Sequence, residues 1–236
     1  MAEASQKTNI KSDKPKVSDI LGDFIQKNRT GIVVCLVLIL AGIIGVTAAF
    51  TIKAKLQEKA LTEVDAFNRR YEALRIYITS EEPDDEPKKA EVGTLLEDLA
   101  AFEARTSGFA AARAYALSAG IYGDQKNWAE AEKAWTNAAR AAAKTYFEPV
   151  CLFNAAAALE EQGSNGAAIE LYNQVLAFSG GFPAAARAQF AVGRLQETQG
   201  AKDAALEAYR ALLSRWPEDP VWANLAQSRI IVLQGQ

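Results

Sequence analysis

The sequence contains no histidine, and it has only two cysteines and one methionine among its 236 residues. Without histidine, the chain cannot build Ser-His-Asp or Cys-His catalytic groups or an imidazole-based metal site. Cys35 lies in an apolar run and Cys151 in the C-terminal half, so we expect two separate buried thiols and no disulfide framework. The cysteines therefore do not indicate the redox compartment.

The charged residues also lack a catalytic or metal-binding arrangement. Glu160 and Glu161 are adjacent, and adjacent residues of a helix point roughly 100° apart, so their carboxylates do not converge. The acidic run at 84–86 lacks the alternating ligands and the glycine of a calcium loop. With a net charge of −3 and no basic stripe, nothing indicates a nucleic-acid partner. We predict that the protein is not an enzyme and has no catalytic residue, cofactor or metal.

What the sequence does contain is an internal repeat between Gly108 and Gln236. Small, aromatic and aliphatic residues recur there with a constant step of 37 residues. The four series are Ala119, Ala156 and Gly193; Ala131, Ala168 and Ala205; Trp135, Tyr172 and Tyr209; and Ala138, Val175 and Leu212. A constant step of this size is typical of stacked helical hairpins, none of which can bury its apolar face alone. We therefore predict two helices per unit, joined by turns at 126–127, 163–165 and 200–202.

These residues resemble the tetratricopeptide repeat, a helical hairpin of about 34 residues. The third unit matches the repeat best, at Gly193, Gly200, Ala205, Tyr209, Leu212 and Pro217. The chain departs from the pattern in its longer step, which requires extra loop residues, and at Gln196, where the first helix usually carries an aromatic residue. The resemblance implies an all-α solenoid of three repeats over 108–236, in which the first helices of the pairs line a concave groove.

The positions that the resemblance places on this groove carry aromatic residues and arginines. They are Arg113, Val150, Phe153, Arg187, Phe190 and Arg194. Phe153 and Phe190 are one step apart, so we expect both rings to be neighbours and exposed in the groove; the alternative is that both pack inside the stack. Of the residues that would clamp a C-terminal carboxylate, only Asn154 and Arg187 are present, which argues against such a clamp.

Residues 31–52 form an uncharged apolar run, which predicts a single transmembrane helix. As a helix the run is about 33 Å long at ~1.5 Å per residue, enough to cross a hydrocarbon core of roughly 30 Å. Its length and long leader disfavour a signal peptide, although the small residues Ala48 and Ala49 leave cleavage open. Val34 precedes Cys35 at the start of the run, which argues against a lipoprotein cysteine.

The segment 1–30 before this run is predicted to be a polar tail with a short amphipathic helix. Residues 1–16 are typical of a disordered tail. Residues 17–25 have helical apolar spacing, which favours a helix in the headgroup layer over a chance pattern. Lysine and arginine are nearly balanced on the two sides of the run, so charge does not fix its orientation.

A stripe of small residues, Ala41, Gly45 and Ala49, follows one face of the predicted span. Such a stripe lets two membrane helices approach closely, and ordinary glycine and alanine usage in spans explains it equally well. Self-association of the chain is therefore left open.

Residues 53–107 are predicted to form a membrane-proximal helical hairpin. Apolar residues recur every three or four positions from Leu56 to Ile78 and again from Val92 to Phe102. The segment 79–89 between them contains two prolines and an acidic run, which predicts a solvated loop. At the other end, Pro220 should start a capping helix, with its apolar residues at Val221, Trp222, Leu225, Ile230 and Leu233.

The order of tail, amphipathic segment, single span, long helix and repeats resembles the YfgM family of bacterial inner-membrane proteins. The stretches that carry this resemblance are VSDILGDFIQKN and LLEDLAAFEARTSGFAAARAYALSAGIYGDQKNWAEAEKAW. It implies a cytoplasmic N-terminus, a periplasmic repeat domain, and an ancillary role at the Sec translocon. The implied partners are translocon subunits, periplasmic chaperones or secreted clients. The alternative is a structural scaffold for envelope assembly or cell division that acts by self-association.

Overall fold

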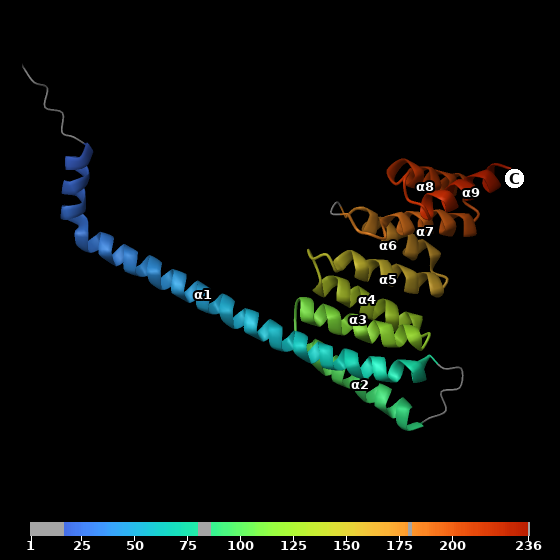
Figure 1. Ribbon diagram of the computed structural model, residues 1–236, viewed down its shortest axis with the longest axis horizontal. Helices are drawn as coiled ribbons and strands as arrows, with labels where there is room; N and C mark the ends of the chain where they lie inside the picture. The colour runs from blue at the N-terminus through green and yellow to red at the C-terminus, as the bar shows by residue number, and fades with distance from the viewer. Residues whose placement is uncertain (1–16, 80–85, 179–180, 236) are drawn as a thin grey trace, which may run out of the picture. The chain divides into compact units, whose positions relative to one another are not determined.

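The computed structural model describes residues 17–79, 86–178 and 181–235, and these residues form helices joined by turns and short loops, with no strand among them (Figure 1). The helices are α1 (Val17–Ile78), α2 (Glu86–Arg105), α3 (Phe109–Asp124), α4 (Trp128–Ala141), α5 (Glu148–Glu161), α6 (Asn165–Leu176), α7 (Ala185–Thr198), α8 (Lys202–Arg215) and α9 (Trp222–Gln234). The predicted all-α class is confirmed. The tail predicted for 1–16 and residues 80–85 of the loop predicted for 79–89 lie outside the described residues. Residues 86–89, predicted to belong to that loop, form the first turn of α2 instead.

The chain divides into two compact units, Met1–Leu56 and Gln57–Gln236. In the first unit, the apolar part of α1 has a mean hydropathy of 2.9 over an 18-residue window, and none of that window is buried. The hydroxyls of Thr47 and Thr51 each donate to a carbonyl four residues earlier, at 2.9 Å. Polar groups satisfied within the helix suit a lipid environment. This helix is a candidate membrane span; the crossing itself stays a prediction.

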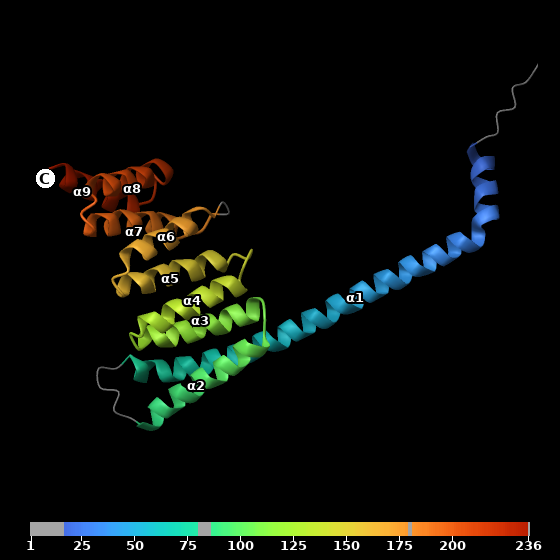
Figure 2. The same cartoon turned by 180° about the vertical axis from the view of Figure 1, so that it is seen from behind.

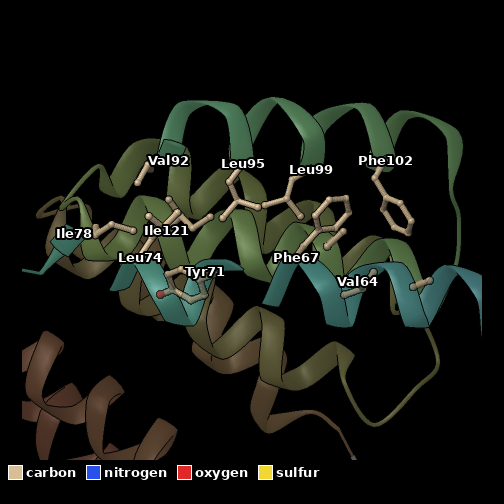
Figure 3. Close-up of a cluster of buried hydrophobic side chains, with 12 residues drawn as sticks. Val64, Phe67, Tyr71, Leu74, Ile78, Val92, Leu95, Leu99, Phe102 and Ile121 are labelled. Atoms are coloured by element: carbon tan, nitrogen blue, oxygen red, sulfur yellow. The ribbon is translucent and has the colours of Figure 1, made fainter. Parts of the chain in front are cut away.

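The second unit begins with the last turns of α1, which pack against α2 and α3. Their shared core contains Val64, Phe67, Tyr71, Leu74, Ile78, Val92, Leu95, Leu99, Phe102 and Ile121. Figure 3 shows the side chains of α1 and α2 pointing toward one another across this core. Phe67 and Phe102 meet edge to face, with ring centroids 5.7 Å apart. The three- and four-residue spacing of these apolar positions places them on one face of each helix, which is why the two helices pair.

Helices α3 to α9 stack in chain order, as both ribbon views show (Figures 1 and 2). Each intra-pair turn contains a residue with positive φ, namely Lys126 at 59°, Gly163 at 73° and Gly200 at 74°. These positions are one repeat step apart, and a left-handed residue of this kind commonly ends a helix. The second helices begin at Trp128, Asn165 and Lys202, again one step apart. The repeat in the sequence is therefore a repeat in backbone conformation.

The small residues of the repeat lie where paired helices cross. Ala168 and Ala205 have no exposed surface, and Ala131 is 1% exposed. Tyr172 and Tyr209 of the second helices are also buried. Small residues at these positions let the helices approach closely, and the adjacent rings then fill the space between pairs.

Helix α9 begins at Trp222 rather than at Pro220, and its buried face includes the predicted Ile230 and Leu233 but not all of the predicted residues. The carboxylate of Asp219 accepts from the backbone N–H groups of Val221 and Trp222, at 3.0 and 2.8 Å, which sets the helix start. Val221 and Leu225, predicted to pack, are 53% and 42% exposed. The buried residues are Ala223, Ala226, Ile230 and Leu233. The pattern misled because two alanines, rather than the larger residues, allow α9 to lie close to its neighbours.

Candidate functional site

A cleft opens on the first helices of the second and third pairs and the start of α9. Its volume is about 260 Å³, and its lining includes Phe153, Glu160, Arg187, Phe190, Arg194 and Trp222. A second cleft of about 420 Å³ lies one repeat further along and is lined by Phe190, Arg194, Glu197, Thr198, Tyr209 and Arg229. Because Phe190 and Arg194 line both, the two clefts form one groove. We call this surface the α5–α7–α9 groove.

A carboxylate on the wall of each cleft joins neighbouring helices. Glu160 of α5 accepts from Arg194 of α7 at 2.5 Å, and the Tyr172 hydroxyl of α6 lies 3.5 Å from its other oxygen. One repeat later, Glu197 of α7 accepts from the Tyr209 hydroxyl of α8 at 3.0 Å. Two guanidinium nitrogens of Arg229 on α9 also donate to Glu197, the Nε at 3.1 Å. We call each set a carboxylate clasp.

Each clasp joins three helices: α5, α6 and α7 around Glu160, and α7, α8 and α9 around Glu197. An isolated surface ion pair joins only two side chains. The clasp carboxylates are partly buried, with side-chain exposures of 22% for Glu160 and 20% for Glu197. Hydrogen bonds to a partly buried charge are stronger than neutral ones and fix geometry. The clasps therefore help to hold neighbouring helices together beside the groove.

The tyrosines in the clasps remain protonated donors at neutral pH. Burial raises the pKa of Tyr209 to about 12. Burial, with the nearby Glu160 carboxylate, raises the pKa of Tyr172 as well. A protonated phenol can donate to a carboxylate, whereas a phenolate would repel it.

The first pair lacks this arrangement, because Gly123 stands one step before Glu160. A related contact forms with α1 instead. Asp124 accepts from the Tyr71 hydroxyl at 2.5 Å and lies 3.4 Å from the guanidinium of Arg75. The hairpin of α1 and α2 is thereby joined to the repeat array by the same chemistry.

The two predicted groove phenylalanines line the same cleft but differ in exposure. Phe153 is only 7% exposed, so the prediction of an exposed ring is wrong for this residue. Its ring packs on those of Tyr172 and Phe182, at centroid distances of 5.3 and 5.8 Å. Phe190 is partly exposed and contacts the rings of Tyr209 and Trp222, each at 5.4 Å. The rings stack on the second helix of their own pair, which the repeat step alone does not reveal.

The predicted groove arginines have different surroundings. The guanidinium of Arg187 lies 5.1 Å from the centre of the Phe153 ring, and Arg187 is exposed. Among the described residues it has no carboxylate partner. Arg194 is engaged by Glu160. Arg113 pairs with Asp65 of α1 at 2.9 Å and does not line the groove.

Two further sets of predicted residues lie apart from this groove. Val150 lines a separate hollow beside Tyr146. Ala41, Gly45 and Ala49 lie on the exposed surface of α1 within the first unit, and a Cβ added to Gly45 would meet no described atom within 4 Å. The structure thus brings together Phe153, Arg187, Phe190 and Arg194, and no others of the predicted set.

Sequence reasoning missed the clasps, although their signal was present. Glu160 and Glu197 are one repeat step apart, as are Tyr172 and Tyr209. Arg194 and Arg229 are separated by 35 residues rather than 37, so the repeat step does not align them. Aligning the acidic and aromatic positions of successive repeats together would have indicated the glutamate–tyrosine pair of each clasp.

No protein-family model matches the chain. A curated relative is 34% identical over 220 residues, covering 89% of this chain and 91% of the relative; it is a TPR repeat-containing protein of Treponema pallidum (strain Nichols). The chain belongs to the TPR repeat-containing proteins. TPR repeats typically mediate protein–protein interaction, so membership in this family supports protein partners.

In the described part of this TPR repeat-containing protein, no group of three or more histidine, cysteine, aspartate or glutamate side chains comes together in a way that could hold a metal ion. Cys151 is buried, and burial raises the pKa of its thiol to about 12, which keeps it protonated and unreactive. The groove presents aromatic rings, a guanidinium and clasped carboxylates.

Proposed function

We propose that this protein is a membrane-anchored scaffold that binds a protein segment in the α5–α7–α9 groove and carries out no catalysis. The observation that supports this most is that the exposed Arg187 and the partly exposed Phe190 line one cleft, in which Arg187 lies over the Phe153 ring. Aromatic residues and arginine are enriched in the cores of protein interfaces, where they supply most of the binding energy. The family supports binding of a protein in general, and the groove suggests where it binds.

The groove favours an apolar segment, extended or helical, with acidic side chains near its ends. Phe190 and Trp222 offer apolar surface that is already partly exposed. Arg194 and Arg229 are engaged by Glu160 and Glu197, so they contribute shape more than free charge. Arg187 remains to attract a carboxylate of the partner.

The experiment is recovery of partners from detergent-solubilised membranes with the full chain as bait. Arg187→Ala should weaken binding by about 1–2 kcal/mol if this arginine is a hot spot. Arg210→Ala on α8 is the matched control, because Arg210 is also exposed but does not line the groove. Equal partner recovery by the two variants would argue that the binding surface lies elsewhere, for example on the hairpin of α1 and α2.

For cellular location, we propose a bacterial inner membrane protein with residues 31–52 as its single span. The N-terminus would lie in the cytoplasm and the repeats in the periplasm. The length and exposure of the apolar part of α1 support the span, and the YfgM-like architecture supports the orientation. Protease added to spheroplasts should digest the repeats; their protection until lysis would reverse the topology.

The partners proposed from the same architecture are translocon subunits, periplasmic chaperones or secreted clients. The second candidate is an envelope-assembly or cell-division scaffold that self-associates through Ala41, Gly45 and Ala49. The open surface around Gly45 favours keeping this candidate. Crosslinking in native membranes separates the two, because translocon or chaperone adducts support the first and homo-oligomers alone support the second.

A further inference from the structure

An aromatic cluster is exposed at the edge of the repeat domain where the first helices begin. Tyr146, in the loop between α4 and α5, is 77% exposed. Its ring lies 5.8 Å from that of Phe109 and 6.4 Å from that of Phe147, and these two rings are 5.7 Å apart. Phe109 and Phe147 are themselves partly exposed. We call Phe109, Tyr146 and Phe147 the aromatic edge.

The loop that presents Tyr146 is held in a defined conformation. Lys144 has a φ of 66°, in the left-handed region, and its backbone N–H donates to the Glu148 carboxylate at 2.6 Å. The Thr145 hydroxyl donates to the carbonyl of Ala142 at 2.6 Å and accepts from the N–H of Phe147 at 3.2 Å. These hydrogen bonds fix the backbone of the loop on both sides of Tyr146. The loop therefore presents the tyrosine side chain to solvent in a defined conformation.

The apolar surface continues beyond the cluster. A hollow of about 610 Å³ beside Tyr146 is lined largely by apolar side chains, including Pro149, Val150, Phe178, Phe182 and Pro183. Exposed Lys144 stands at its rim. Aromatic rings with an adjacent lysine are the composition that proteins place at the boundary between lipid and water.

Chain length limits how far this edge can lie from the membrane that the proposed span crosses. Within the second unit, the Gln57 side chain donates to the carbonyl of Ser107 at 3.3 Å, two residues before Phe109. Gln57 follows Ile52, the end of the uncharged run, by only five residues. Five residues of chain reach at most about 18 Å, whatever their conformation. The opposite end of α3, at Asp124, is roughly 22 Å from Phe109 along the helix at ~1.5 Å per residue.

We propose that the aromatic edge inserts into the headgroup layer of the membrane, so that the repeat domain has a second contact with lipid besides its span. The tyrosine and phenylalanine rings enter the boundary of the acyl chains, and Lys144 meets lipid phosphates. Lys53 and Lys55, which follow the span, supply further positive charge to the same leaflet. This inference rests on the membrane anchor of the proposed function.

The test uses the full chain in vesicles of phosphatidylcholine and phosphatidylglycerol, with one nitroxide label per variant. Label positions are residue 146 (Tyr146→Cys) and residue 125 (Gln125→Cys), each with Cys35→Ala and Cys151→Ala. Gln125 is exposed at the far end of α3 and is the matched control. A third variant keeps the native, exposed Cys35 and reports on the span itself. The measurement is the ratio of collisions with oxygen, which concentrates in lipid, to collisions with an aqueous nickel chelate.

The proposal predicts a ratio at residue 146 several-fold above that at residue 125 and below that at Cys35. If Cys35 is in lipid while residues 146 and 125 have equal ratios, the aromatic edge does not contact the membrane and the anchor stands. If Cys35 is as accessible to nickel as residue 125, the anchor fails, and this inference with it.

A second comparison tests Tyr146 itself. A label at exposed Ala143 in the same loop reports on the edge, with Tyr146 intact or changed by Tyr146→Glu. A carboxylate at this position opposes insertion, so the ratio at residue 143 should fall several-fold. Because Tyr146 is mostly exposed, the melting temperature should not change. An unchanged ratio would contradict the proposal.

Discussion

Arg194 of α7 donates to the carboxylate of Glu160 on α5 at 2.5 Å, across the groove wall between two successive repeats. One repeat further on, Arg229 of α9 donates to Glu197 of α7. From the sequence alone, such arginines would be taken as free to bind a partner. In the structure, Arg194 and Arg229 are engaged in joining the repeats. Arg187, which lies over the Phe153 ring, is the groove arginine left for a partner among the described residues.

The crossing of α7 and α8 has no room for a side chain at residue 193. A Cβ built on Gly193 would lie 2.5 Å from Cε1 of Tyr209, closer than any real contact. Gly193→Ala should therefore destabilise the protein by about 1–3 kcal/mol, because the buried Tyr209 ring must move. Urea unfolding of the full chain in detergent, followed by circular dichroism, measures the change.

Gly93→Ala is the matched control for this substitution. Gly93 lies inside α2 with nothing within 4 Å of an added Cβ. Alanine there should stabilise the helix by about 0.5–1 kcal/mol through its higher helix propensity. If both variants gain stability, the close approach of Gly193 and Tyr209 is wrong.

Phe153 should be required for folding more than for binding. Its ring is buried against Tyr172 and Phe182, so Phe153→Ala leaves a cavity and should cost about 3 kcal/mol. Tyr146→Ala is the exposed aromatic control and should change stability by less than about 0.5 kcal/mol. Thermal melting compares them, and a Phe153→Ala variant that melts with the parent would return this ring to the exposed surface.

Stability should fall at alkaline pH as the buried tyrosines ionise. Burial raises the pKa of Tyr209 from its ordinary 10.0 to about 12, so the fold favours the neutral phenol. Its contribution is complete below pH 10 and is lost as the pH rises from 10 toward 12. In Tyr209→Phe this part of the loss should disappear, leaving a shallower decline due to tyrosines such as Tyr172. Unfolding free energies measured across this window check it, and parallel declines in parent and variant would refute it.

The repeat step made the helical pairs predictable, because it records a geometric requirement that each pair shares. The helix crossings at Ala168 and Ala205, the left-handed turns at Gly163 and Gly200 and the confirmed all-α class follow from it. The step could not predict side-chain partners across the stack. Whether Phe153 faces the groove or Tyr172 depends on rotamers and on α6, and Arg113 meets Asp65 on a helix outside the repeats.

The sequence predicted which helix face carries the candidate site, but not which of its side chains are exposed and which are paired. Four of the six predicted residues line one cleft because equivalent positions of α5 and α7 are neighbours. The clasps depend on long side chains that reach from one pair to the next, and Arg229 is two residues out of step. Contacts of this kind follow from packing, which periodicity alone does not determine.

The central claim, that the α5–α7–α9 groove binds a protein, is tested most directly by photo-crosslinking in native membranes. A photoreactive amino acid replaces Glu161, which lines the cleft together with Arg187, in one variant and Arg210 in another, and both positions are exposed. The account predicts protein adducts from residue 161 and few or none from residue 210. Equal adducts from both positions, or none from residue 161, would contradict it.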